Sequence, residues 1–226
     1  MIEAVIFDLD GVLMDSEQLW DQARREVAEQ HGGRWREGAT EAMQGMSSPE
    51  WSQYLHDTVG VELDTEQIVA SVVDELLERY SRSLPLMPGA VEVVERLGQS
   101  WPLGLASSSN RGVIDAVLED VGLAPMFAAT VSSEEVERGK PAPDVYLEAA
   151  ARLGVAASHC CAVEDSANGI RSAAAAAMFV AAIPNRRYPP SPDALGLAGL
   201  VVTNLGDLTA GAIRAGWAEW SGAVAG

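Results

Sequence analysis

Hydrophobic and polar residues follow two different patterns in two parts of the chain. Residues 4–7 (AVIF) form a short apolar run without polar alternation, which predicts a strand buried on both faces of a sheet. From residue 15 to residue 86, apolar residues recur at helical spacing, as in EQLWDQARREVAEQ and EQIVASVVDELLERYSRSL. Asp15 or Ser16 is expected to cap the first of these helices.

Beyond the segment PLMPG, apolar strands and amphipathic helices alternate. The predicted strands are PLGLA, MFAATV, HCCAV, MFVAAI and a short one near residues 199–203, with helices such as GVIDAVLEDVG and DVYLEAAARLG between them. This alternation is typical of βαβ units, in which helices cover both faces of a parallel sheet. We therefore predict an α/β protein with a Rossmann-like, three-layer core, residues 1–14 and 87–226, and an all-helical domain, residues 15–86, inserted after the first strand.

The composition is that of a folded protein in which acidic residues outnumber basic ones. Of its 226 residues, 48% are hydrophobic, which is ample for a core. The formal net charge of −18 disfavours nucleic acid or an anionic membrane as a partner, because both need clustered cations. We expect neither a signal peptide nor a membrane span. The adjacent Cys160 and Cys161 are expected to be reduced, buried residues of a cytoplasmic protein.

Polar side chains directly follow three of the predicted strands. They are Asp8 and Asp10 after the first strand, Ser107 to Asn110 after PLGLA, and Glu164 and Asp165 after HCCAV. Ligands of open α/β sheets bind beyond the carboxyl ends of the strands, so these groups are expected to share one site. Lys140, in the loop GKPAPD, is a further candidate. Each feature alone has an ordinary alternative as a turn, a helix cap or a surface lysine, but their combination favours a site.

The segments DLDGVLMDSE, LASSSN, GKPAPDVYLEAA and VEDSANGIRSA, in this order, resemble the motifs of the haloacid dehalogenase superfamily of phosphohydrolases. The resemblance covers nearly the whole chain, because the helical insert falls where one branch of that superfamily has a cap. That branch includes sugar-phosphate phosphatases and β-phosphoglucomutase. One departure is Ala177, where the family often has glycine, and we expect it to affect helix packing more than chemistry.

Four converging carboxylates cannot all stay ionised without a counter-charge, so a hard divalent cation is expected among them. Mg²⁺ is the cation that pairs with phosphate. The resemblance implies that Asp8 and Asp165 bind it through their carboxylates and Asp10 through its backbone carbonyl. Glu164 would bind it directly or support the residues that do.

The same residues suggest a mechanism. Asp8 is the expected nucleophile, giving an aspartyl-phosphate, and Asp10 the general acid and then the base. Ser107 is expected to hold phosphoryl oxygens, and Lys140 to balance their charge. The predicted substrate contacts are Ser107, Ser108, Asn110, Lys140, Gly45 and Trp20. For Trp20, plain packing between cap helices is an equal alternative.

The expected function is a Mg²⁺-dependent phosphatase for a small phosphorylated sugar or polyol, acting as a monomer or weak dimer. A β-phosphoglucomutase-like mutase is the alternative. The cap of such mutases begins with a histidine after DTAEY, which the stretch DSEQLW here lacks. A dehalogenase is disfavoured, because Asp10 and Mg²⁺ would be superfluous for a halide leaving group. A purely regulatory domain is disfavoured because all four motifs are intact.

Overall fold

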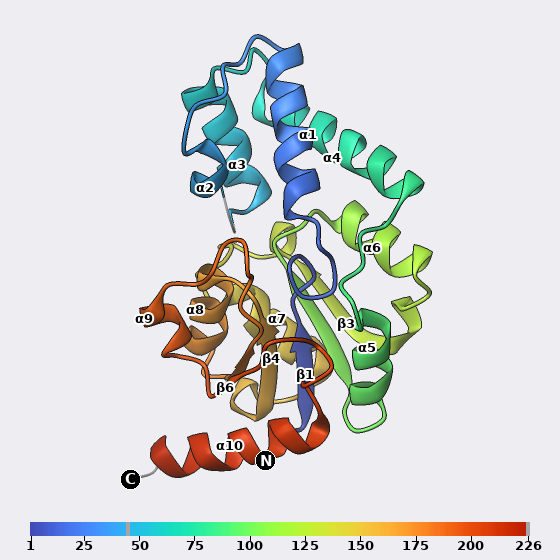
Figure 1. Ribbon diagram of the computed structural model, residues 1–226, viewed down its shortest axis with the longest axis vertical. Coiled ribbons are helices and arrows are strands. Elements are labelled where there is room, and N and C mark those ends of the chain that lie inside the picture. Colours follow the sequence, from blue (N-terminus) through green and yellow to red (C-terminus); the bar gives the residue numbers. More distant parts are fainter. Residues whose placement is uncertain (44–45, 225–226) are drawn as a thin grey trace.

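A computed structural model describes residues 1–43 and 46–224 of the chain (Figure 1). Within these ranges, six parallel strands form one sheet in the order β3-β2-β1-β4-β5-β6. The strands are β1 (Ala4–Phe7), β2 (Leu103–Ser107), β3 (Phe127–Ser132), β4 (Cys160–Glu164), β5 (Phe179–Ala182) and β6 (Leu200–Val201). The predicted Rossmann-like α/β architecture is confirmed, and β1 lies at its centre between β2 and β4.

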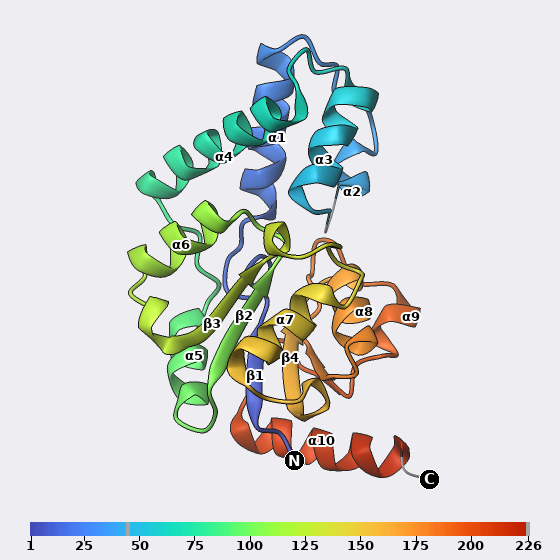
Figure 2. The same cartoon turned by 180° about the vertical axis from the view of Figure 1, so that it is seen from behind.

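Helices cover both faces of the sheet (Figures 1 and 2). They are α5 (Ala90–Gly98), α6 (Arg111–Asp120), α7 (Asp144–Leu153) and α8 (Ala167–Ala175). The short α9 (Pro192–Leu195) packs against α8, and α10 (Ala210–Val224) lies across the amino end of the sheet, near the N-terminus. Val5 and Phe7 belong to one hydrophobic cluster, whereas Ala4 and Ile6 belong to another. Successive side chains of a strand point to opposite faces, so this division explains why the first strand is apolar throughout.

The helical insert lies over the carboxyl ends of the strands (Figure 1). It consists of α1 (Glu17–Gln30), α2 (Ala39–Ala42), α3 (Ser48–Tyr54), a π-helical turn (Leu55–Val59) and α4 (Thr65–Arg82). None of the helices in the described ranges combines the length and apolar character needed to cross a membrane.

Two connecting segments join the insert to the core and lie side by side. Met14 faces Leu86 in an antiparallel bridge, and the backbone N–H of Met87 donates to the carbonyl of Leu13 at 2.9 Å. The predicted boundaries of the insert, after residue 14 and before residue 87, fall within these two connecting segments. They stay a prediction.

Ser16 occupies the position before α1, but its hydroxyl makes no capping hydrogen bond. The hydroxyl instead donates to a carboxylate oxygen of Asp10. A carboxylate is a strong acceptor, so Ser16 ties the start of the insert to the end of β1. The start of the helix was predicted correctly, but the predicted side-chain cap was wrong.

Ala177 follows α8 with a φ of +58°, in the left-handed region that favours glycine. A side chain there costs about 1 kcal/mol relative to glycine. We therefore expect Ala177→Gly to raise the free energy of unfolding by about 1 kcal/mol, measured by urea denaturation. Gly154→Ala is the mirror control, because Gly154 has a φ of +69° and a Cβ added there would meet nothing within 4 Å.

That control is expected to lower the free energy of unfolding by a similar amount. If both substitutions shifted stability in the same direction, backbone strain at Ala177 would not be the cause.

Candidate active site

Three carboxylates gather at the carboxyl ends of two neighbouring central strands. Asp8 directly follows β1, Glu164 ends β4, and Asp165 follows it. Each offers an oxygen within 4.8 Å of the others, and all three side chains are buried. The register pairs Phe7 with Val163, and the N–H of Asp8 donates to the Val163 carbonyl at 3.0 Å. The parallel pairing of β1 with β4 therefore places these distant acids side by side.

Lys140 reaches this cluster from the loop before α7. Its Nζ lies 2.8 Å from Oδ1 of Asp8 and 2.6 Å from Oε1 of Glu164, and the side chain is 3% exposed. The hydroxyl of Tyr146, on α7, donates to the same Glu164 oxygen at 2.7 Å. Three carboxylates face one ammonium, which leaves two negative charges uncompensated if all three are ionised. A divalent cation would compensate these two negative charges.

The pKa values reflect this shortage of positive charge. Burial, opposed by the charge of Lys140 and reinforced by the charge of Glu164, raises the pKa of Asp8 to about 8. Burial, with the charges of Glu164 and Asp8, holds the pKa of Asp165 well above its usual range. Burial disfavours the charge on Lys140, but Asp8 and Glu164 together raise the pKa of its ammonium above the ordinary value. The lysine is therefore protonated, and the carboxyls need a further cation to ionise together.

Asp165 carries a direct sign of a ligand site. Its Oδ1 is buried and has no hydrogen-bond partner among the described residues, whereas its Oδ2 accepts from the Asn185 amide at 3.1 Å. Gly11 has a φ of +79°, and a Cβ there would lie 1.9 Å from Oδ2 of Asp165. Only glycine leaves room for this carboxylate. A buried carboxylate oxygen without a partner, in an all-oxygen donor set, fits a hard cation such as Mg²⁺.

Asp10 lies beside this cluster, between the core and the insert. Its Oδ1 accepts hydrogen bonds from the Ser16 hydroxyl and from the Trp20 indole N–H, the latter at 3.1 Å. Its Oδ2 accepts from the hydroxyl of Ser109 at 2.5 Å. Three donors thus hold this carboxylate in place. Metal binding through its backbone carbonyl stays a prediction.

A pocket lies between the acidic cluster and the insert. The core and the insert both contribute to its walls. The lining side chains include Asp8, Asp10, Ser108, Ser109, Lys140 and Asp165 from the core, and Trp20, Arg24, Met43 and Trp51 from the insert.

Ser107 and Asn110 do not line this pocket, although both were predicted to contact substrate. Ser107 is fully buried, and its hydroxyl accepts from the N–H of Ser109 at 3.0 Å. The Asn110 amide donates to Glu134 and accepts from the Ser48 hydroxyl of α3 at 2.9 Å. Asn110 therefore links the core to the insert. Ser108 does line the pocket, and its hydroxyl is buried without a partner in the described part of the chain.

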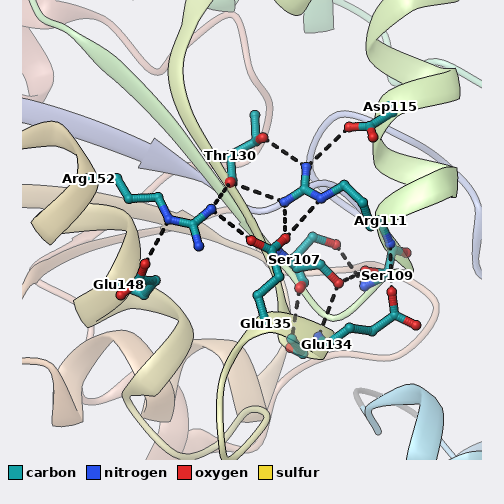
Figure 3. Close-up of polar contacts among 11 residues, drawn as sticks. Ser107, Ser109, Arg111, Asp115, Thr130, Glu134, Glu135, Glu148 and Arg152 are labelled. Carbon is teal, nitrogen blue, oxygen red and sulfur yellow. Dashed lines mark hydrogen bonds and ion pairs between the residues drawn. The ribbon is translucent and has the colours of Figure 1, made fainter.

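An ion-pair network holds the loop after β2 from its outer side (Figure 3). Glu135 pairs with Arg111, at the start of α6, and with Arg152 of α7, the latter at 2.8 Å. Glu134 accepts from the backbone N–H of Arg111 at 2.9 Å. These contacts tie the segment after β3 to the start of α6, and so fix the loop that carries Ser108 and Ser109.

Trp20 lies where it can both pack between helices of the insert and contact a ligand in the pocket. Its ring lies 6.2 Å from that of Trp51, centroid to centroid, so it packs inside the insert. It also lines the pocket and donates to Asp10. Gly45, another predicted contact, lies outside the described residues.

Four further residues belong to this site but were not among the predicted site residues. Ser109 lies within the serine run after β2, and Asn185 follows β5 at the same edge of the sheet, so both carried the strand-end signal. Tyr146 and Arg24 come from helices, where nothing in a single sequence separates them from ordinary packing residues.

Comparisons with known proteins identify what this chain resembles. The haloacid dehalogenase-like hydrolase family matches residues 2–177. Hexitol phosphatase B of Escherichia coli K12 is 32% identical over 226 residues, covering 92% of this chain and 95% of the relative. β-Phosphoglucomutase of Bacillus subtilis is 30% identical over 230 residues, covering 97% of each chain. The crystal structure of β-phosphoglucomutase from Clostridium difficile has the same fold, with a TM-score of 0.83, 24% identity, and coverage of 97% of this chain and 99% of that one.

Proposed function

The chain belongs to the haloacid dehalogenase-like hydrolases, and on that premise we propose that it is a Mg²⁺-dependent phosphatase for a small phosphorylated sugar or polyol. The observation that carries the proposal is the position of Asp8. Its carboxylate pairs with Lys140, lies beside Glu164 and Asp165, and lines the pocket. The relatives named hexitol phosphatase and fructose-1-phosphate phosphatase, both of Escherichia coli, support the substrate class.

Asp8, Glu164 and Asp165 would hold Mg²⁺, with Asp10 contributing its backbone carbonyl. When bound, the ion offsets the negative charge that substrate and carboxylates bring together. A carboxylate oxygen of Asp8 attacks phosphorus, and the bond from phosphorus to the sugar oxygen breaks. Asp10 gives a proton to that leaving oxygen. Asp10 then takes a proton from water as the water attacks phosphorus, which releases phosphate and restores Asp8.

The hydroxyl of Ser108 and the neighbouring backbone N–H groups would hold the phosphoryl oxygens. The Ser108 hydroxyl has no partner among the described residues, so it is free to donate to a ligand. Ser107 supports the loop through its bond to the N–H of Ser109. Lys140 stays protonated and stabilises the charge that develops at the phosphoryl group.

Trp20 favours hydrolysis over the mutase alternative. It ends the stretch DSEQLW, which lacks the histidine of the mutase-like cap, and its indole N–H donates to Asp10. An indole N–H can donate a hydrogen bond, but it cannot exchange a proton as an imidazole does. The pair of Trp20 and Asp10 is therefore built to position one acid rather than to exchange protons with two different sugar hydroxyls in turn.

We further propose that the enzyme acts in the cytoplasm. Cys160 and Cys161 are both buried and free, which is typical of proteins in reducing compartments. The charge of −18 favours a small metabolite over a nucleic acid or a membrane as the ligand. A monomer or weak dimer remains our expectation for the assembly.

The proposed function is tested by measuring phosphate release from a panel of phosphorylated sugars and polyols, with Mg²⁺ and with EDTA. We expect release with Mg²⁺ and its loss in EDTA, with recovery when excess Mg²⁺ is added. Sugar products are analysed in parallel, because a mutase would return the phosphoryl group to the sugar. Full activity in EDTA, or isomerised sugar phosphate in place of free phosphate, would contradict the proposal.

A further inference from the structure

Arg24 is a cation of the insert that lines the same pocket as Asp8 and Lys140. It lies on α1, one turn beyond Trp20. Its guanidinium carbon is 5.1 Å from the ring centroid of Trp20 and 5.0 Å from that of Trp51. Its Nε is buried without a hydrogen-bond partner among residues 1–43 and 46–224. A charged side chain in this state needs an explanation.

The charges of three carboxylates act on Arg24, those of Asp10, Asp21 and Glu17, and none of the three forms an ion pair with it within the described ranges. Glu17 lies against Asn185 and Arg187. Asp21 accepts from Nε of Arg25 at 2.8 Å and also from the hydroxyl of Thr40. Asp10 accepts from its own three donors, two of them serine hydroxyls and the third the indole of Trp20. Arg24 is thus not simply the partner of a neighbouring acid.

The stacking decides which part of Arg24 a ligand can reach. Two indole rings lie against the guanidinium, so its edge, with the terminal N–H groups, is the part left to bind a ligand in the pocket. Burial lowers the pKa of Arg24 to about 10, which still leaves it charged at neutral pH. A planar, forked and charged donor matches the geometry of a carboxylate or a phosphate.

Arg24 and Lys140 serve different ends of the pocket. Lys140 is bound to Asp8 and Glu164, where the phosphoryl group would be transferred. Arg24 lies on the insert side, with the indole of Trp20 between it and Asp10. In the proposed mechanism Asp10 protonates the leaving oxygen, so the rest of the substrate extends from Asp10 toward the insert.

We propose that Arg24 is a specificity-determining residue that binds a second anionic group, a carboxylate or a second phosphate, on the leaving part of the substrate. This inference rests on the proposed phosphatase function and narrows its substrates to phosphorylated sugar acids or sugar bisphosphates.

The test compares kcat/KM for two matched pairs of substrates. Gluconate 6-phosphate and glucitol 6-phosphate differ only in a carboxylate or a hydroxymethyl group at carbon 1. Fructose 1,6-bisphosphate and fructose 1-phosphate differ in the second phosphate, so the two pairs distinguish the two anions. We expect the wild-type protein to prefer the anionic member of at least one pair by about tenfold or more.

Arg24→Gln is expected to reduce that preference by about 10- to 100-fold, because a charged hydrogen-bond donor is lost. Arg24→Lys keeps the charge but not the forked donor. Its preference for the anionic substrate is expected to lie between those of the wild-type protein and the Arg24→Gln protein. Arg36→Gln is the matched control, since Arg36 is an exposed arginine of the same insert that does not line the pocket. It is expected to keep the wild-type preference. Circular dichroism checks that each variant is folded.

Two outcomes would overturn the inference. One is a wild-type preference at or below one for both pairs, which decides the question even if the variants do not fold. The other is an Arg24→Gln protein that keeps the wild-type preference. Hydrolysis of p-nitrophenyl phosphate by the wild-type protein separates the two proposals. If the wild-type protein hydrolyses neither this compound nor any of the four sugar phosphates, the phosphatase function fails. If it hydrolyses them without any preference for anions, only the role of Arg24 fails.

Discussion

Asp8→Asn is expected to lower the rate of p-nitrophenyl phosphate hydrolysis by at least about 10⁴-fold while leaving the fold intact, because an amide is a poor nucleophile. Asparagine has nearly the same shape as aspartate, and its carbonyl oxygen can still accept from Lys140. The fold should therefore survive. Steady-state rates with saturating Mg²⁺, together with far-ultraviolet circular dichroism, measure both effects.

The control for this substitution is Asp120→Asn, which removes the same charge from an exposed position at the end of α6. It is expected to leave the rate unchanged. If the Asp8→Asn protein kept a rate close to that of the control, Asp8 would not be the nucleophile.

Lys140→Met has the second largest expected effect, and it acts on stability as well as activity. The side chain is 3% exposed and pairs with Asp8 at 2.8 Å and Glu164 at 2.6 Å, so its loss leaves buried carboxylates without a counter-charge. We expect the free energy of unfolding to fall by about 3–5 kcal/mol in EDTA. Mg²⁺ should restore part of the loss by supplying positive charge. Urea denaturation with and without Mg²⁺ gives both values.

Activity of the Lys140→Met protein is expected to fall by about 10²-fold or more, because a preorganised charge next to the phosphoryl group is removed. Arg138→Met is the control in the same loop. Arg138 is 66% exposed and pairs with Asp144 at 3.0 Å. Breaking that pair should change the free energy of unfolding by less than about 1 kcal/mol. If both variants lost the same free energy of unfolding, the buried ion pairs of Lys140 would stabilise the protein no more than the exposed pair of Arg138.

The sheet was predictable because its strands carry local signals. β1 begins and ends at the residues that the apolar run predicts, and polar side chains follow β1, β2 and β4 at one edge. Because ligands bind at that edge, the strand ends alone predict that Asp8, Glu164 and Asp165 gather in one cluster, as they do. Lys140 joins them although it lies in a loop, because the loop before α7 passes over the same edge.

The contacts between the insert and the core were not predictable in the same way. Ser16 looks like a helix cap in the sequence, but its hydroxyl donates instead to the nearby carboxylate of Asp10. Asn110 was predicted to contact substrate, which stays a prediction, and in the structure Glu134 and Ser48 occupy both ends of its amide. These outcomes depend on where α1 and α3 lie relative to the sheet. Side-chain periodicity contains no information about that placement.

The central claim is that Asp8 takes up the phosphoryl group and Asp10 then activates water. The Asp10→Asn protein tests it directly with p-nitrophenyl phosphate, whose leaving group needs no acid catalyst. We predict a burst of about one nitrophenolate per chain followed by a stall, and mass spectrometry after borohydride reduction should locate the trapped group at Asp8. A group trapped on any other side chain, or steady turnover without a burst or a trapped group, would contradict the account.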